Sequence, residues 1–390
     1  MKIFHIEFAK VGLGASGGET GMIEIIKYLK SKKIENVLLT TDNGKETYQK
    51  LGLLEDEYLK YICINSYAVE KRVHAFISYV LRVFQAANIV KTIYPANEDA
   101  FICHSDFFPN SIPMYLLARK NENTKLIYFF HLLCPDLFKG YKGHFTNKFY
   151  FPTANVVHYK LNQWLFKCLA RKRGVLVTVN DYYRNILEKK YPYNKIYVMK
   201  SVGGVKVEPG SLKKEYDLVW MGRFHEQKGL FEMLDIVRLI KQKDKGIKVV
   251  VVGDSSEKFK NRFLDILSKL GLQENVNCAG FVPNDEKNDI LKKSKVFLMT
   301  SLYESFGSVN LEAMTCGVPV IAYNLPVFDI FKKGMIRVPI LDNARFAEET
   351  LHLLRDDTYY SRISQDALST ASNYSSEKTG EEIYNLIVYK

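Results

Sequence analysis

Short apolar runs rich in β-branched residues alternate with longer stretches of helical period along the whole chain. The predicted strands cover 2–8, 36–41, 61–64, 100–105, 125–130, 175–179 and 196–200, then 217–222, 247–253, 275–280, 295–300 and 318–323. The stretches between them have the length and period of helices that cross over a sheet. This alternation predicts an α/β protein of parallel, doubly wound sheets covered by helices.

The two sets of strands are separated by residues 201–216, a Gly- and Lys-rich stretch with Pro209 that is the best linker in the chain. We therefore predict an N-terminal domain over 1–205 and a C-terminal domain over 206–373. A length of 390 residues agrees with two cores rather than one. Because ligands of such sheets bind beyond the carboxyl ends of the strands, the cleft between the domains is the expected site.

The formal net charge of +12 is unevenly distributed. Residues 1–205 contain 29 Lys and Arg against 17 Asp and Glu, whereas 206–390 contain 26 of each. Such an excess produces a long-range field that attracts anionic partners, although a solvated basic surface explains it equally well. Because the excess is diffuse and no recognition motif is visible, a nucleic-acid partner is not expected.

The cysteines and the apolar runs exclude other classes of protein. The six cysteines are scattered without a Cys-x-x-Cys motif, so neither a disulfide framework nor a zinc site is expected. No apolar run reaches the roughly 20 residues of a spanning helix, and the N-terminus lacks the order of a signal peptide. We expect a cytoplasmic protein.

Glycines follow the first predicted strand at Gly12, Gly14, Gly17 and Gly18, where a helix-like segment opens. Glycine lets the backbone approach a ligand, and the amides of a helix N-terminus attract phosphate. The spacing does not complete a dinucleotide-binding motif, and a plain strand-to-helix turn explains these glycines equally well.

Two cations follow the first strand of the second half, where Gly222 and Arg223 lead to Lys228. Arg binds phosphate oxygens with a fork of donors and Lys with a point charge, so the pair suits a diphosphate. A cation at a helix N-terminus is otherwise unfavourable. The loops after 247–253 and 275–280 could seat a base through backbone groups, but simple connections account for them more readily.

The stretch SLYESFGSVNLEAM holds Glu304 and Glu312 on either side of a Phe-Gly pair. The preceding strand is predicted to end near Thr300 and a helix to begin at 308–310. A carboxylate accepts hydrogen bonds from two sugar hydroxyls at once, so two carboxylates here favour a hydroxyl-rich ligand. Either glutamate alone would indicate no more than a solvated charge.

These segments together resemble one family. The order GRF-x4-KG, VVGD, E-SFG-x3-E and AMTCGVPVIA is similar to the retaining GT-B glycosyltransferases of family 4, the group 1 glycosyl transferases. The N-terminal half resembles them weakly, through SGGE, FFH and VTVNDYYRNIL. The resemblance implies the GT-B fold, in which two Rossmann-like domains face each other across a cleft. It also implies a last helix, here 374–390, that crosses back onto the first domain.

The resemblance also implies roles for residues. The expected catalytic residues are Arg223, Lys228, Glu304 and His131. The expected donor-binding residues are Gly17, Gly18, Gly222, Gly280, Phe281, Val282, Phe306, Gly307, Ser308, Val309 and Glu312. Arg223 and Lys228 would hold the diphosphate, Glu312 the ribose and Glu304 the donor sugar. His131 would lie near that sugar, although a packed histidine at a strand end is as good an interpretation.

The implied activity is transfer of a hexosyl unit from a UDP- or GDP-sugar to a glycan or lipid-linked acceptor, with retention of configuration. Cell-surface polysaccharide or glycoconjugate synthesis is the implied context. No cofactor and no metal are expected, because no Asp-x-Asp ends a strand and cations with helix amides can stabilise the leaving diphosphate. The alternatives are a nucleotide-sugar epimerase, a synthase acting on a soluble sugar phosphate, and a non-catalytic nucleotide-sugar-binding subunit.

Two departures from the family pattern concern the donor sugar and the linker. YNLPVFDIF stands where the family has a glycine-rich turn and a glutamate, so Asp329 is only an approximate match, and VGGV replaces the usual turn before the linker.

The basic and aromatic helical segment 69–94 could lie on an anionic membrane, near a second basic cluster at Arg171, Lys172 and Arg173. Packing of this helix on its own sheet is the favoured alternative. If the segment does lie on a membrane, the first domain is expected at the inner face of that membrane, as a peripheral protein.

Overall fold

The computed structural model describes residues 1–10, 16–66, 72–134, 136–138, 154–170, 173–200, 212–254 and 256–389. They form two compact units. Unit 1 holds the described residues up to 137, those between 154 and 200, and those from 375 onward. Unit 2 holds Phe138 and the described residues from 212 to 374. Most of the predicted linker, together with Gly12 and Gly14, lies outside the described residues.

Unit 1 is built on a parallel sheet of seven strands in the order β3-β2-β1-β4-β5-β6-β7. The strands are β1 (Lys2–Glu7), β2 (Glu35–Thr41), β3 (Leu59–Ile64), β4 (Ala100–Cys103), β5 (Lys125–Phe129), β6 (Val175–Thr178) and β7 (Lys195–Val198). The strand order reverses between β1 and β4, which pair directly through Ile3 and Ala100. The four residues of β4 are all buried, as expected for a strand covered on both faces.

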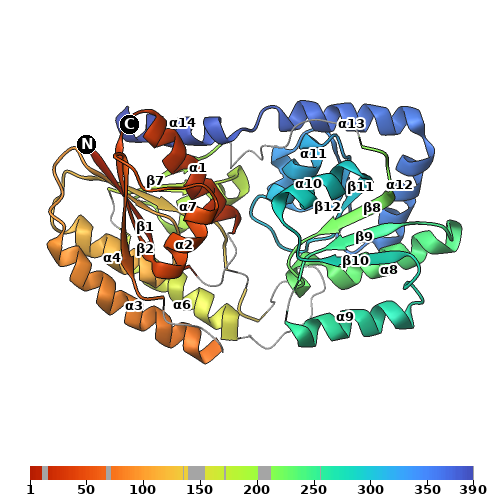
Figure 1. The fold of residues 1–390 in the computed structure, drawn as a ribbon, viewed down its shortest axis with the longest axis horizontal. Helices are drawn as coiled ribbons and strands as arrows, with labels where there is room; N and C mark the ends of the chain where they lie inside the picture. The colour runs from red at the N-terminus through yellow and green to blue at the C-terminus, as the bar shows by residue number, and fades with distance from the viewer. Residues whose placement is uncertain are drawn as a thin grey trace. The chain divides into compact units, whose positions relative to one another are not determined.

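Helices cover both faces of the unit 1 sheet (Figure 1). They are α1 (Gly17–Ser31), α2 (Asp42–Lys50), α3 (Arg72–Thr92), α4 (Phe108–Ala118), α6 (Ala154–Leu169), α7 (Asp181–Lys190) and α14 (Ser376–Val388). The helix α14 packs against α1, and its Ile383 and Leu386 join Ile25 and Leu29 in one buried cluster. The helices α3, α4 and α6 lie on the opposite side of the sheet. The last helix therefore completes the core of the first domain.

Unit 2 is built on a parallel sheet of six strands in the order β10-β9-β8-β11-β12-β13. The strands are β8 (Tyr216–Met221), β9 (Val249–Val252), β10 (Val276–Gly280), β11 (Ser294–Met299), β12 (Val320–Tyr323) and β13 (Met335–Val338). Here the order reverses between β8 and β11, which pair through Leu218 and Val296. Both units are thus doubly wound, as the alternation of strands and helices predicts.

The helical elements of unit 2 are η1 (Glu226–Lys228), α8 (Leu230–Lys243), α9 (Glu257–Lys269), α10 (Asn284–Lys292), α11 (Ser308–Thr315), η2 (Pro326–Ile330), α12 (Asn343–Arg355) and α13 (Asp357–Ala371). One face of the sheet and the helices α8, α9 and α12 share a single apolar core that contains Trp220, Phe263 and Phe346. Figure 1 shows α10 and α11 on the other face.

All twelve predicted strands are present, and the prediction missed one, β13. The prediction failed there because β13 has only four residues and is an edge strand, where three of the four side chains keep some solvent exposure. The helix α10 begins without a side-chain cap, since Pro283 occupies the N-cap position and Asn284 begins the helix.

Candidate active site

The centre of the unit 2 sheet is where its strand order reverses, between β8 and β11. The connections that leave these two strands run to opposite sides of the sheet, and ligands of doubly wound sheets bind outside the carboxyl ends of the strands at such a reversal. Lys228 lies in η1, directly after β8, and Glu304 lies in the connection after β11. The topology therefore brings together two predicted catalytic residues that are 76 positions apart in the chain.

Lys228 and Glu304 form an ion pair, with Lys228 Nζ 2.5 Å from Glu304 Oε1. The Glu304 side chain is buried, whereas that of Lys228 keeps a fifth of its surface exposed. A charge-assisted hydrogen bond of this kind is stronger than a neutral one and fixes the direction of the ammonium group. The pair therefore holds a cation at the reversal point with part of its surface open to a ligand.

Backbone contacts hold the two connections against each other. Leu302 N donates to Gln227 O at 2.8 Å, and Gln227 Nε2 donates to Tyr303 O at 2.8 Å. Gly229 adopts a φ of +64°, and a Cβ there would lie 1.8 Å from Thr300 O. Only glycine allows η1 to turn into α8 this close to the end of β11.

The glycines at the ends of β8, β9 and β10 have a structural role that the sequence did not show. Gly253 N donates to Gly280 O at 2.8 Å, and Gly222 N donates to Val252 O at 3.0 Å. A Cβ on Gly253 would lie 1.9 Å from Gly222 O, so the two connections touch through their backbones. Beside them, the Arg223 side chain is exposed and forms no ion pair with the other described residues.

The backbone after β10, from Gly280 to Val282, is predicted to border a base. The side chains of its last two residues differ, since Phe281 is 78% exposed while Val282 is buried. An aromatic ring this exposed offers a stacking surface at the carboxyl end of the sheet.

The helix α11 begins after Gly307, whose φ of +76° is left-handed and which supplies no side-chain cap. The first-turn amides of Ser308 and Val309 therefore point outward from the helix without a capping oxygen. Phe306 is buried and contacts Phe331 and Tyr374 edge to face, so it anchors this helix start rather than facing solvent. The predicted helix start at 308–310 is confirmed.

Glu312 lies in α11 and pairs with Lys287 of α10, with Glu312 Oε2 2.9 Å from Lys287 Nζ. Both side chains are mostly buried. Lys287 was not predicted, because nothing in the spacing of 25 residues indicates that α10 and α11 are neighbours. Each of the two predicted glutamates is therefore held by a lysine from another connection. Asp329, the approximate match to the family's glutamate, forms an ion pair with Arg337.

In unit 1, His131 follows β5 and its ring lies against the first turn of α1. The imidazole Nε2 lies 2.9 Å from His104 O, so it carries the proton and donates. Burial lowers the pKa of His131, which keeps the ring neutral. Gly17 and Gly18 are helical residues in that turn, and a Cβ on Gly18 would lie 2.9 Å from His131 Nε2.

A buried polar cluster, which was not predicted, surrounds the carboxyl end of β1. Asn110 Oδ1 accepts from Phe8 N at 2.6 Å and its Nδ2 donates to Glu7 Oε2 at 3.2 Å. Burial raises the pKa of Glu7 to about 8. Nearby, His5 Nδ1 lies 2.9 Å from His104 Nε2, and burial lowers the pKa of His5 to about 4. Lys10 pairs with Glu19 at 2.9 Å.

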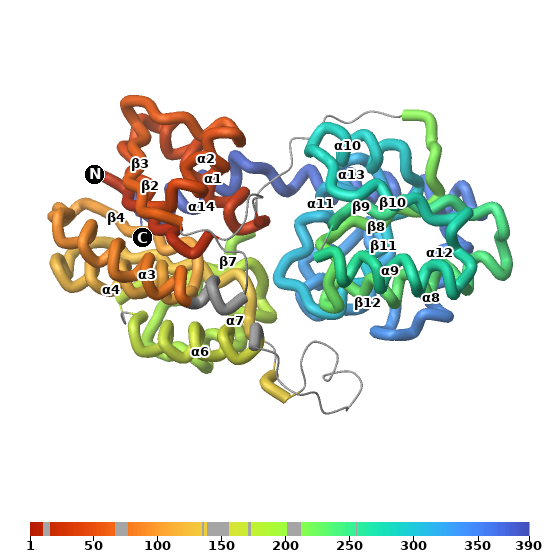
Figure 2. Tube along the Cα trace, turned by 60° about the horizontal axis from the view of Figure 1, so that its bottom comes forward, coloured from red at the N-terminus to blue at the C-terminus, as the bar shows by residue number. Residues whose placement is uncertain are grey.

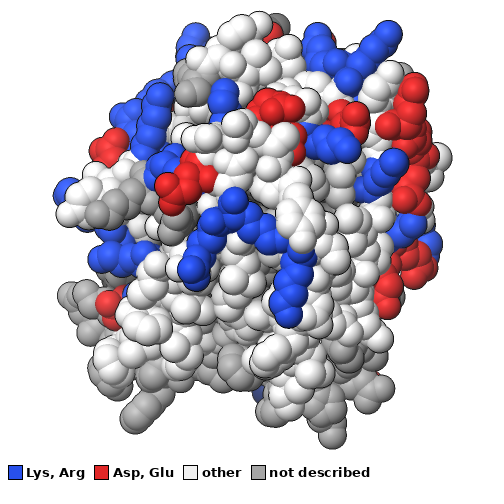
Figure 3. All heavy atoms as spheres, turned by 90° about the vertical axis from the view of Figure 1, so that its left-hand side faces the viewer, with Lys and Arg blue, Asp and Glu red and all other residues white. Residues whose placement is uncertain are grey.

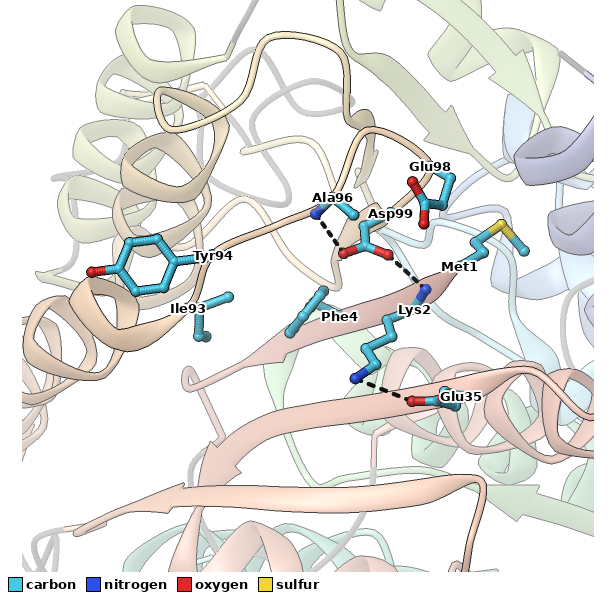
Figure 4. A pocket seen from close by; sticks show the side chains of 9 residues that line it. All are labelled: Met1, Lys2, Phe4, Glu35, Ile93, Tyr94, Ala96, Glu98 and Asp99. Carbon is cyan, nitrogen blue, oxygen red and sulfur yellow. Dashed lines mark hydrogen bonds and ion pairs between the residues drawn. The ribbon is translucent and has the colours of Figure 1, made fainter.

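A cavity of about 350 Å³ lies at the amino ends of the unit 1 strands (Figure 4). Its walls include Lys2, Glu35 and Asp99, which stand at the amino ends of β1, β2 and β4. Lys2 Nζ pairs with Glu35 at 3.3 Å and Lys2 N donates to Asp99 at 2.7 Å, so these polar groups of the cavity wall satisfy one another. Ligands of doubly wound sheets bind at the other end of the strands, and this cavity is not the candidate site.

Comparison with known proteins places unit 2 in a family. Residues 205–369 match the family model described as glycosyl transferases group 1. Unit 2 is a group 1 glycosyl transferase domain. Lys228, Glu304 and Glu312 all lie within the matched residues, on the connections described above.

Two curated relatives show how far this similarity extends beyond the group 1 domain. An uncharacterized glycosyltransferase of Methanocaldococcus jannaschii is 25% identical over 250 residues, which cover 60% of this chain and 57% of the relative. The amylovoran biosynthesis glycosyltransferase AmsD of Erwinia amylovora is 24% identical over 216 residues, covering 53% of this chain and 59% of the relative. The match thus spans a little over half of the length of each of these two relatives.

The fold similarity includes both units. The structure of a mutant of S. aureus TarM, in complex with Fondaparinux, alpha-GlcNAc-glycerol and UDP, matches with a TM-score of 0.76. The match covers 99% of each chain at 13% sequence identity. The chain that carries the group 1 domain therefore has the GT-B fold, with two Rossmann-like units.

Proposed function

We propose that the chain is a glycosyltransferase that moves a hexosyl unit from a UDP- or GDP-sugar to a glycan or lipid-linked acceptor with retention of configuration. The observation that carries the proposal is the Lys228–Glu304 pair at the strand-order reversal of a group 1 domain. The matched TarM structure contains UDP, and AmsD is named for amylovoran biosynthesis. These names support a nucleotide-sugar donor and a role in cell-surface polysaccharide or glycoconjugate synthesis.

In the proposed reaction, the bond between the sugar and the diphosphate breaks, and negative charge develops on the leaving nucleotide. Lys228, directed by Glu304, stabilises that charge together with Arg223 and the amides that begin α11. Because these donors are already oriented, they need little reorganisation as the bond breaks. Stabilisation of this kind requires no metal ion.

The remaining contacts fix the donor. Glu312, held by Lys287, accepts hydrogen bonds from the ribose hydroxyls, and the exposed Phe281 ring offers the base a stacking surface. In unit 1, the neutral His131 donates through Nε2 to His104 O, which leaves its Nδ1 as an acceptor for a sugar hydroxyl. The acceptor would be held mainly by unit 1.

A two-step experiment tests the proposal. Calorimetric titration with UDP-, GDP- and ADP-sugars identifies the donor, and turnover of that donor is then measured for Lys228→Ala and Glu304→Ala. Each substitution removes preorganised charge stabilisation, so kcat should fall by roughly a hundredfold or more. Rates like those of the unmodified protein in both variants would rule out this site.

A matched control is available in the same sheet. Lys295 pairs with Asp217 at 2.8 Å, but at the amino ends of β11 and β8. Lys295→Ala removes a lysine–carboxylate pair of similar geometry at the wrong end of the strands. Turnover should be unchanged in this variant, which separates loss of the site from loss of any ion pair.

A further inference from the structure

The helix α3 presents three large apolar side chains to solvent. Ile77, Leu81 and Phe84 are 50%, 39% and 67% exposed. Their spacing of four and three residues places them on one side of the helix. The opposite side, with Tyr79 and Arg82, is buried in unit 1. The helix therefore packs on its own sheet, as the favoured alternative supposed, and still carries an apolar outer face.

The helix α6 repeats this arrangement. Val157, Leu161 and Trp164 are 40%, 53% and 64% exposed, again at a spacing of four and three residues. Phe166 and Asn162 face the interior of unit 1. Two helices far apart in the chain thus expose matching apolar stripes. Single exposed apolar residues are normal on a protein surface, whereas stripes of this kind call for an explanation.

The two helices are neighbours. The rings of Tyr79 in α3 and His158 in α6 lie 5.8 Å apart, and α4 packs against both helices. Figures 1 and 2 both show α3, α4 and α6 on the same side of unit 1. We call the six exposed residues of α3 and α6 the apolar ridge: Ile77, Leu81, Phe84, Val157, Leu161 and Trp164.

The sequence around the apolar ridge is basic and lacks acidic residues. No Asp or Glu occurs between Glu70 and Glu98 or between Asp136 and Asp181, although the rest of the chain mixes both signs. Exposed lysines flank the ridge at Lys91 in α3 and at Lys160 and Lys167 in α6. Figure 3 shows Lys and Arg side chains across the middle of one face of unit 1, with few charged side chains below them.

Arg173, one of the three basic residues predicted to form a cluster near this surface, is used differently. Its guanidinium donates to Ala118 O and Asn121 O, each at 3.0 Å, so it closes the end of α4. Arg171 and Lys172 lie outside the described residues. The charge beside the ridge therefore comes from α3 and α6 themselves.

We propose that the apolar ridge is a docking surface for an anionic lipid bilayer. Apolar side chains beside lysines on a helix that lies in the interface, with a tryptophan among them, match the physics of peripheral membrane binding. No helix in the described part of the chain is long and apolar enough to cross a bilayer. A second copy of the chain fits less well, because two ridges face to face would bring lysines of the same sign together.

This inference rests on the proposed function for the nature of the acceptor. It deepens that function, because docking on a bilayer places unit 1 where a lipid-linked acceptor is found. Binding to vesicles, however, does not depend on donor chemistry. Membrane docking and glycosyl transfer can therefore fail separately.

Flotation of the full chain with vesicles tests the docking surface. The vesicles contain phosphatidylcholine alone or an equal mixture with phosphatidylglycerol. The double variant Phe84→Gln, Trp164→Gln should partition at least about tenfold more weakly into the mixed vesicles. Lys160→Glu with Lys167→Glu should also weaken binding and reduce its dependence on salt. The control is Leu54→Gln with Tyr193→Gln, which removes exposed apolar side chains from unit 1 outside the ridge.

Tryptophan fluorescence gives a second readout. The chain has two tryptophans, Trp164 on the ridge and Trp220 buried in unit 2. Lipids brominated on the acyl chain should quench Trp164 alone, in mixed vesicles only, while calorimetric donor binding stays unchanged. The proposal is overturned if the unmodified chain fails to float with mixed vesicles at low salt, or if the ridge variants bind as well as the control. It is also overturned if the ridge variants abolish a dimer seen by ultracentrifugation instead of vesicle binding.

Discussion

Glu7 carries an acidic group away from water, at the carboxyl end of β1. Burial raises its pKa to about 8, from an ordinary value of 4.5. Between those pH values the folded protein holds a proton that the unfolded chain releases, so the free energy of unfolding falls as pH rises. Glu7→Gln keeps the shape of the side chain but removes the carboxyl group that ionises. We expect it to be more stable than the unmodified protein at pH 8, by on the order of a few kcal/mol, and similar near pH 5.

Denaturant unfolding measured from pH 5 to pH 8.5 checks this expectation. Glu57→Gln serves as the control, because Glu57 is exposed on the surface of unit 1 and its replacement removes a carboxyl group outside the buried polar cluster. If Glu7→Gln and the unmodified protein lost stability in parallel as pH rises, Glu7 would not be the group that titrates.

At the scale of the elements, the sequence was informative wherever apolar period decides structure. Strands such as β9 (VVVV) and helices between them are set by local pattern and burial, so they could be predicted. Edge strand β13 could not, because its four residues are only partly buried. The predicted cations and carboxylates lie after β8 and β11, but their pairing depends on strand order. Lys228–Glu304 and Lys287–Glu312 are contacts that no spacing along the chain can reveal.

The junction of η1 with α8 shows how one element positions the site. Gly229 and Gly271 both have a φ of +64°, but a Cβ on Gly229 would meet Thr300 O at 1.8 Å whereas one on Gly271 would meet nothing within 4 Å. Gly271→Ala should therefore lower the free energy of unfolding only by the cost of placing alanine in the left-handed conformation, about 1–2 kcal/mol. Gly229→Ala must also displace η1 from β11, so we expect a loss of roughly 3 kcal/mol or more and weaker donor binding. Equal losses in denaturant unfolding of the two variants would show that the contact with Thr300 is unimportant.

Among the described residues, the buried apolar clusters of unit 1 are separate from that of unit 2, and this should be visible in the unfolding of the protein. Ile383 of α14 belongs to the core of unit 1, and Leu234 of α8 belongs to that of unit 2. Truncating either to alanine leaves a cavity that costs about 2–5 kcal/mol. Because each core is buried within its own unit, Ile383→Ala should shift one unfolding transition and Leu234→Ala the other. In a Trp164→Phe background Trp220 is the remaining tryptophan, so its fluorescence follows the transition of unit 2, in whose core it lies.

A bound UDP- or GDP-sugar should raise the midpoint of the Trp220 transition more than that of the remaining circular dichroism change, because ligand stabilises the unit that holds it. Ile383→Ala should leave that shift intact, and Lys228→Ala should reduce it. A single transition, moved equally by both core variants and by the donor, would mean that the two units unfold as one cooperative body. The donor would then be stabilising unit 1 as strongly as the unit that carries Lys228 and Glu304, which the assignment of donor binding to unit 2 does not allow.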